Sequence, residues 1–200
     1  MRDRILSRLA GTRAAPDPAV AALAALEPEL AQAFSALRLT PAAVLVPLVE
    51  RQSELSVLLT RRTEHLRDHA GQISFPGGRV ETDDAGPLQT ALRESREEVG
   101  LPAERVEVAG YLPARAVVTG FAVTPVVGFI APDLAHVADA REVADIFEVP
   151  LTWFLDPANR MQSTRRWGGT EFPVCEYRYQ AHRIWGATAQ IVDEFVTLIA

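Results

Sequence analysis

The sequence predicts a mixed α/β (α+β) domain in which a sheet lies between helices, in three layers. The chain has 200 residues, 48% of them hydrophobic, which is enough to build one sizeable core. Segments typical of strands and helices follow one another without the regular alternation of a parallel βαβ array. One segment, Pro87–Val99, has a strong helical pattern bounded by residues that suit the two ends of a helix.

The first forty residues are rich in alanine and leucine, and we expect two helical stretches there, interrupted at Pro16 and Pro18. Residues 42–50 and 55–61 have the composition of two strands joined by a polar turn. A glycine-containing loop over residues 63–84 then leads into the predicted helix.

Pro87 suits the first position of that helix, and Gly100 suits the residue just past its end. Beyond it we expect strands at 106–112, 121–130 and 146–149, a short helix from Pro150 and a hairpin across 161–179. The chain ends in an amphipathic helix. Its apolar face carries Ile191, Val192, Phe195, Leu198 and Ile199.

Charge and composition exclude several classes of protein. The net charge of −6 and the pI near 5.3 argue against non-specific nucleic-acid binding, which needs a basic face. The single cysteine, Cys175, excludes an intrachain disulfide and a cysteine-based zinc site, and we expect an inert buried thiol. The longest apolar run, residues 42–49, is far below the ~18 residues of a membrane span, so we expect no membrane partner.

The coding bias of the chain points to its source. All 20 basic residues are arginine, which together with the abundance of alanine is typical of a GC-rich bacterium. The N-terminal residues lack the apolar region of a secretory signal. We therefore expect a cytoplasmic bacterial protein, and a homodimer is one of the oligomeric states that the sequence leaves open.

The predicted central helix carries a cluster of acidic side chains. Its apolar residues fall on one face of a helical wheel, and Glu94, Glu97 and Glu98 fall on the opposite, solvent-directed side. Glu94 and Glu98 are four residues apart, which places their Cβ atoms roughly 6 Å from each other. Two carboxylates at this separation can share hard divalent cations. Arg93, four residues before Glu97, can hold it by an ion pair.

Two glycines, Gly77 and Gly78, follow Phe75-Pro76 and form a sharp turn before this helix. A backbone carbonyl in such a turn can point at a metal ion that the glutamates hold. A solvated charged face is the simpler interpretation of an acidic helix, and the glycine turn favours a metal site instead.

The segment from Gly78 to Leu101 resembles the Nudix box. That box has a glycine, five residues, a glutamate, seven residues and then Arg-Glu-apolar-any-Glu-Glu-any-Gly-apolar. Here Gly78 is followed by five residues, Asp84, eight residues and then Arg93-Glu94-Ser95-Arg96-Glu97-Glu98-Val99-Gly100-Leu101. Asp84 replaces the glutamate, the spacer is one residue longer and Ser95 fills an apolar slot, but the spacing of the glutamates is intact.

The resemblance implies the Nudix fold, a mixed sheet sandwiched between helices, and hydrolysis of a nucleoside diphosphate linked to another group with Mg²⁺ or Mn²⁺. We expect residues 41–200 to form this domain and residues 1–40 to form a helical extension. The residues that the resemblance places at the metal are Glu94 and Glu98 as the main ligands, Glu97 as support, the carbonyl of Gly77, and Arg93 as an orienting ion-pair partner.

A second pattern precedes the box and resembles the signature of coenzyme A diphosphatases within the same family. It consists of Leu58-Leu59-Thr60-Arg61-Arg62-Thr63, then Arg67, Gly71 and Phe75-Pro76-Gly77-Gly78, and Thr63 is its one departure. Coenzyme A carries a diphosphate and a 3′-phosphate, and guanidinium groups bind phosphate oxygens in bidentate fashion. The candidates for substrate binding are Arg62 and Arg67, with His69 and Gln72 as further donors.

The implied reaction is attack of water on a diphosphate phosphorus, which gives 3′,5′-ADP and 4′-phosphopantetheine. The general base is left open between Glu94 and Glu142, a carboxylate from a later loop. Three functions compete: a coenzyme A diphosphatase, a Nudix enzyme acting on ADP-ribose or another dinucleotide, and a Nudix-like binding module that has lost catalysis. The upstream arginine pattern favours the first over the second, and the retention of all three helix glutamates disfavours the third.

Overall fold

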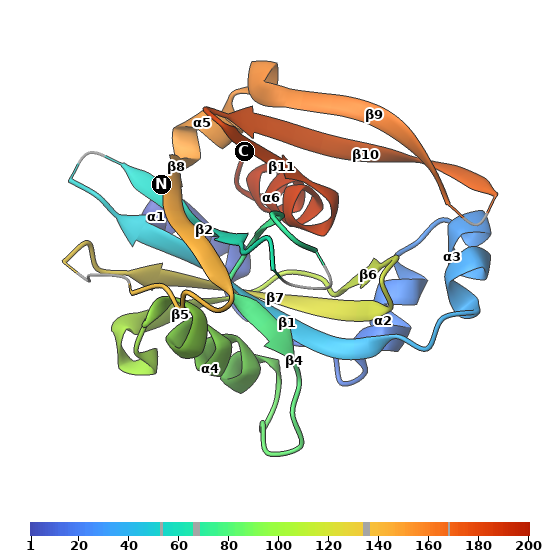
Figure 1. The fold of residues 1–200 in the computed structure, drawn as a ribbon, viewed down its shortest axis with the longest axis horizontal. Coiled ribbons are helices and arrows are strands. Elements are labelled where there is room, and N and C mark those ends of the chain that lie inside the picture. Colours follow the sequence, from blue (N-terminus) through green and yellow to red (C-terminus); the bar gives the residue numbers. More distant parts are fainter. Residues whose placement is uncertain (53, 66–68, 134–136, 168) are drawn as a thin grey trace.

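The computed structural model describes residues 1–52, 54–65, 69–133, 137–167 and 169–200, and Figure 1 shows how its elements are arranged. The helices are α1 (Arg2–Leu9), α2 (Pro18–Ala24), α3 (Pro28–Ser35), α4 (Pro87–Val99), α5 (Leu151–Leu155) and α6 (Gly186–Ile199), with single 3₁₀ turns η1 (Ala103–Arg105) and η2 (Pro157–Asn159). The strands of the larger sheet are β1 (Thr40–Glu50), β2 (Leu55–Arg62), β3 (Ile73–Ser74), β4 (Gly77–Arg79), β5 (Val106–Tyr111), β6 (Arg115–Val117), β7 (Phe121–Ile130) and β8 (Val143–Pro150). The smaller sheet contains β9 (Arg160–Trp167), β10 (Thr170–Tyr179) and β11 (His182–Trp185).

The larger sheet is mixed. Its central strands β1 and β7 run parallel, from Thr40 opposite Phe121 to Val49 opposite Ile130. The other strands join antiparallel, with β2 beside β1, β8 beside β2 and β5 beside β7. The short strand β4 pairs with the first part of β1, so the two glycines of the turn lie against the centre of the sheet.

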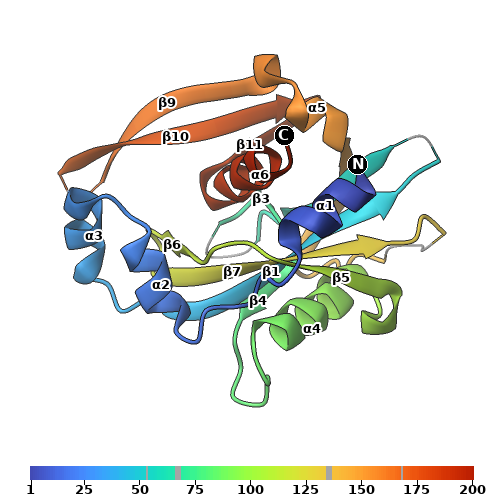
Figure 2. The same cartoon turned by 180° about the vertical axis from the view of Figure 1, so that it is seen from behind.

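The two faces of this sheet are covered by different helices. Alternate residues of β1 point to opposite faces, so Ala43 and Leu45 pack against α4 while Val46 and Leu48 belong to the core that α6 and α1 cover. Figures 1 and 2 show α4 on one face and α6 with α1 on the other, with the smaller sheet beyond α6. The predicted three-layer α/β/α arrangement is therefore confirmed, and the smaller sheet adds a further layer.

The N-terminal residues form three helices, and the prediction of two helical stretches interrupted at Pro16 and Pro18 was wrong. Pro18 begins α2 and Pro28 begins α3, because the fixed φ and missing N–H of proline suit the first turn of a helix. Asp17 caps α2 by accepting from two backbone N–H groups. The division between an extension and a domain at residue 40 stays a prediction, although α1 contributes Ile5 to the largest core.

Other predictions differ from the structure at their edges. The segment 63–84, predicted as a loop, contains the short strands β3 and β4, which exist only because β2 and β1 supply their hydrogen-bond partners. Strand β8 begins at Val143, three residues before the predicted 146, because it pairs with the end of β2. The hairpin at 161–179 is confirmed as β9 and β10. Cys175 is buried, and burial raises the pKa of its thiol to about 11, as expected of an inert side chain.

Candidate active site

Helix α4 is fixed at both ends and along one face. Pro87 occupies its first turn, and Gly100 ends it in the left-handed conformation with a φ of 68°. Ala91, Ser95 and Val99 form the buried face. The hydroxyl of Ser95 donates to the carbonyl of Ala91 at 2.6 Å, which satisfies a polar group in a slot where the family pattern has an apolar residue.

Glu98 is buried at the side of this helix, with 4% of its surface exposed, so the expectation that it faces solvent was wrong. The N–H of Gly77 donates to one carboxylate oxygen at 3.3 Å, and Arg62 lies 3.7 Å from the other. Burial raises the pKa of Glu98 to about 8, opposed by Arg62 and the Gly77 N–H and reinforced by the negative charges of Glu94 and Glu142. The helical wheel missed this burial because the cover comes from β2 and β4 rather than from α4 itself.

Close approach of backbone requires a glycine at Gly77, whereas Gly78 lies against the end of a flexible side chain. A Cβ at Gly77 would lie 2.4 Å from the carbonyl oxygen of Ala43, and a Cβ at Gly78 would lie 2.3 Å from a carboxylate oxygen of Glu94. The backbone of the turn therefore lies directly against β1 and against the acidic helix. The predicted role of the Gly77 carbonyl stays a prediction.

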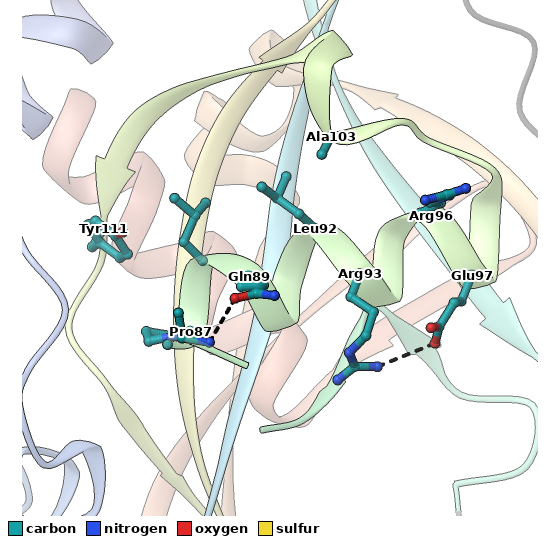
Figure 3. Close-up of a pocket in the computed structure, with 11 residues that line it drawn as sticks. Pro87, Gln89, Leu92, Arg93, Arg96, Glu97, Ala103 and Tyr111 are labelled. Atoms are coloured by element: carbon teal, nitrogen blue, oxygen red, sulfur yellow. Dashed lines mark hydrogen bonds and ion pairs between the residues drawn. The ribbon is translucent and has the colours of Figure 1, made fainter. Parts of the chain in front are cut away.

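Arg93 holds the acidic helix and the preceding loop together. Its guanidinium lies 2.8 Å from Glu94, 3.3 Å from Glu97 and 3.0 Å from Asp84, and it also donates to the carbonyl of Arg79 at 3.1 Å. The ion pair with Glu97 is the one that the spacing of four residues predicted. Figure 3 shows this pair on the exposed flank of α4.

Asp84, whose role the sequence left open, is the strongest anchor of Arg93. Its carboxylate also accepts from the hydroxyl of Thr90 at 2.8 Å and from the N–H of Glu81 at 3.0 Å. Arg93 and these donors hold the pKa of Asp84 well below its usual range. The shorter aspartate thus closes the lengthened loop onto the helix, a contact that sequence reasoning missed.

Arg62 and Glu142 complete the cluster from the other side of the turn. Arg62 lies 3.7 Å from Glu98 and 4.0 Å from Glu142, whose side chain is half exposed. The N–H of Thr63 donates to the carbonyl of Glu142 at 2.9 Å, which keeps the two residues side by side. Burial raises the pKa of Glu94, and the charge of nearby Glu142 adds to that rise. The structure therefore places Glu142 close enough to the acidic helix for its charge to act on Glu94 and Glu98.

The remaining predicted substrate residues lie just before β3. His69 Nδ1 and Gln72 Oε1 are 2.9 Å apart, so these two side chains hydrogen-bond to each other. The carbonyl of Gln72 accepts from the N–H of Arg62 at 2.9 Å, which joins this segment to the cluster. Arg67 lies outside the described residues.

Comparison with known proteins identifies the family. A model of the NUDIX domain matches residues 39–166. A relative from Enterobacter sp. (strain 638), called "Uncharacterized Nudix hydrolase NudL", is 46% identical over 158 residues, which cover 79% of this chain and 82% of the relative. A relative of the same name from Cronobacter sakazakii is 45% identical over 174 residues, covering 87% and 89%. The chain belongs to the Nudix hydrolase family.

Solved structures agree with this Nudix hydrolase at the level of the fold. A MutT/nudix family protein from Enterococcus faecalis matches with a TM-score of 0.51 at 17% identity, over 80% of this chain and 62% of that one. DR0079 from Deinococcus radiodurans matches with a TM-score of 0.50 at 13% identity, over 79% and 85%. Nudix hydrolases act on diphosphate-containing substrates and generally use divalent metal ions such as Mg²⁺ or Mn²⁺.

The donor set of this Nudix hydrolase fits such an ion. Carboxylate oxygens are the ligands that Mg²⁺ and Mn²⁺ prefer, and a buried carboxylate with a raised pKa gains from a cation beside it. Within the described parts of the chain, no three acidic, histidine or cysteine side chains converge on one point. The carboxylate of Glu94 is turned toward Arg93. One carboxylate oxygen of Glu98 accepts from the N–H of Gly77, and the other lies near Arg62. Metal binding therefore requires these carboxylates to exchange partners.

A separate open pocket of about 990 Å³ lies along another flank of α4 (Figure 3). Its lining includes Leu92, Tyr111, Arg93 and Glu97 but neither Glu94 nor Glu98. We therefore take the glycine turn, rather than this pocket, as the candidate active site. Every helix in the described part of the Nudix hydrolase is too short or too polar to span a membrane.

Proposed function

We propose that this Nudix hydrolase cleaves the diphosphate bond of coenzyme A to give 3′,5′-ADP and 4′-phosphopantetheine. The observation that carries the proposal is the position of Arg62. This arginine belongs to the pattern that resembles coenzyme A diphosphatases, and its guanidinium lies 3.7 Å from Glu98 of the Nudix helix. The two motifs thus meet at one site, where phosphate-binding and cation-binding groups are side by side.

Each residue of the candidate site has a proposed role in metal or phosphate binding. Glu94 and Glu98, with support from Glu97 and the Gly77 carbonyl, would hold Mg²⁺ or Mn²⁺, which would neutralise phosphate oxygens and acidify water. Arg62 binds an oxygen of the diphosphate, and Arg67, His69 and Gln72 are proposed to contact the remaining phosphates. Arg93 fixes the direction of Glu94 through its bond of 2.8 Å.

Glu142 is our candidate for the general base. Its half-exposed carboxylate can accept a proton from the attacking water, whose oxygen forms a bond to phosphorus as the P–O–P bridge breaks. Its place beside Arg62 puts it next to the proposed phosphate site. Glu94 is less suited to this task, because Arg93 already occupies one of its carboxylate oxygens.

The direct test is a substrate panel with purified protein and Mg²⁺ or Mn²⁺. Coenzyme A, ADP-ribose, NADH and diadenosine polyphosphates are compared, and product masses identify the bond that is cut. We expect coenzyme A to be the best substrate and excess chelator to abolish turnover. Faster cleavage of ADP-ribose would replace the proposal with the second candidate, and full turnover in chelator would remove the metal from the mechanism.

Dephospho-coenzyme A tests recognition of the 3′-phosphate separately. Losing one charge-assisted hydrogen bond costs about 2 kcal/mol, which corresponds to a roughly thirtyfold lower kcat/KM. Equal rates on the two compounds would show that this phosphate is not recognised.

A further inference from the structure

Arg62 is held firmly by its backbone and loosely by its side chain. Its N–H donates to the carbonyl of Gln72 at 2.9 Å, and the following residue, Thr63, donates to the carbonyl of Glu142 at the same distance. The pairing of β2 with β8 shifts register between Arg61 and Arg62, and an irregularity of this kind changes the direction of a side chain. The guanidinium is thereby placed between Glu98 and Glu142.

Among the described residues, this guanidinium makes no short hydrogen bond. Its nearest carboxylate oxygens are 3.7 Å away on Glu98 and 4.0 Å away on Glu142, whereas a charge-assisted bond is about 2.7–2.9 Å long. The Nε of Arg62 is buried and has no hydrogen-bond partner among the described residues. A buried donor without a partner is costly, so this arginine has donors available for an acceptor that the described residues do not supply.

A divalent cation bound by Glu98 would compete with Arg62 for the same carboxylate. Glu98 is buried, so its charged form requires a positive partner, and in this structure Arg62 supplies the charge on its second oxygen. A guanidinium and a divalent cation beside the same carboxylate repel each other. Binding of the cation to Glu98 therefore favours departure of Arg62.

We propose that Arg62 is an exchangeable counter-ion that couples metal binding to phosphate binding. Without ligands, its guanidinium lies beside Glu98 and Glu142 and is the positive partner of either carboxylate when that group is ionised. When a divalent cation binds Glu98, the guanidinium moves to a phosphate oxygen of the substrate. This inference rests on the proposed function, because it gives the diphosphate the role of second acceptor.

Reciprocity of binding free energies makes the proposal testable. If phosphate draws Arg62 away from the carboxylates, phosphate must raise the affinity for the cation, and the cation must raise the affinity for phosphate by the same factor. An arginine that only supports the fold, or only contacts the substrate, would not oppose the cation in the ligand-free protein.

The experiment measures Mn²⁺ affinity by titration calorimetry, with and without AMP or 3′,5′-ADP, for the wild type, Arg62→Gln and Arg62→Lys. Without nucleotide, we expect Arg62→Gln to bind Mn²⁺ about tenfold more tightly than the wild type, and Arg62→Lys to stay near the wild type. Nucleotide should raise the Mn²⁺ affinity of the wild type about tenfold and that of Arg62→Gln less than twofold.

Arg61→Gln is the matched control, because Arg61 is the neighbouring residue of β2, lies opposite Asp145 in the strand register with β8 and makes no ion pair with Glu98. Its Mn²⁺ affinity should equal that of the wild type. Thermal melting of each metal-free variant verifies that it is folded before titration. Unchanged or weaker Mn²⁺ binding by folded Arg62→Gln without nucleotide would overturn the exchange.

This result is independent of the substrate panel. A preference for ADP-ribose would replace coenzyme A as substrate and leave the exchange standing, since AMP also supplies a phosphate. If the protein cleaves coenzyme A but Arg62→Gln shows no gain in Mn²⁺ affinity, the proposed function stands and the exchange of Arg62 is contradicted.

Discussion

Arg93 and Arg62 lie on two sides of the same acidic cluster, and their side chains are almost equally exposed, at 23% and 25%. Arg93 makes bonds of 2.8 Å to Glu94 and 3.0 Å to Asp84, while the nearest carboxylate to Arg62 is 3.7 Å away. These short bonds occupy the donors of Arg93, which thereby holds α4 against the preceding loop. The Nε of Arg62 has no partner among the described residues, so burial alone does not distinguish a structural arginine from one that can bind a ligand.

The largest effect on turnover should come from Glu98, the carboxylate that lies nearest to Arg62. Glu98→Gln removes the charge of a proposed metal ligand, and we expect turnover of coenzyme A to fall at least ~100-fold. Steady-state rates at saturating Mn²⁺ measure this, with circular dichroism to verify the fold. A variant with near-normal turnover would remove the acidic helix from the mechanism.

Substitution of Arg93 should mainly lower the free energy of unfolding. Arg93→Gln leaves Asp84 and Glu94, whose side chains are 3% and 16% exposed, without their cation. Breaking a buried ion pair from one side costs about 3 kcal/mol of the free energy of unfolding. Urea denaturation of this variant and of Arg62→Gln makes the comparison, and the Arg62 variant should lose less than about 1 kcal/mol because its contacts are long. Equal losses would contradict the distinction between the two arginines.

The pH dependence of stability should show the burial of Glu98. Its pKa is raised from the ordinary 4.5 to about 8 in the folded protein, so the unfolded chain releases this proton first as pH rises. The stability that the protonated carboxyl contributes is full below about pH 4.5 and is lost as pH approaches 8. Between about pH 5.5 and about pH 7, the metal-free protein should lose about 2 kcal/mol through this group.

Urea denaturation in chelator at several pH values measures this loss. Glu98→Gln should flatten the profile, and Mn²⁺ should stabilise the wild type because the folded carboxylates bind it. A wild-type profile that matches that of Glu98→Gln would show that Glu98 does not titrate in this interval.

The smallest effect is expected at Glu97. Its side chain is 59% exposed and is held by Arg93 at 3.3 Å, so Glu97→Gln should lower turnover less than about tenfold and leave stability within about 0.5 kcal/mol. The variant is also the matched control for Glu98→Gln on the same helix. A loss as large as that of Glu98→Gln would place Glu97 among the main metal ligands.

The sequence by itself determined α4, the spacing of its glutamates and the family. Pro87 and Gly100 mark the helix, and the pairing of Arg93 with Glu97 follows from a spacing of four residues. These features are local, because hydrogen bonds and side-chain neighbours within a helix depend only on residues a few positions apart. The Nudix motif is a contiguous stretch of sequence, so it could be recognised without knowledge of the fold.

Only the tertiary structure decided which groups meet at the site. Glu98 is buried because β2 and β4 cover it, and Arg62 and Glu142 reach it from positions 36 residues before and 44 residues after it in the chain. Asp84 became the partner of Arg93 through the path of the intervening loop. Such contacts depend on strand register and on the packing of the helix against the sheet. A helical wheel contains neither, and it therefore placed a buried carboxylate in solvent.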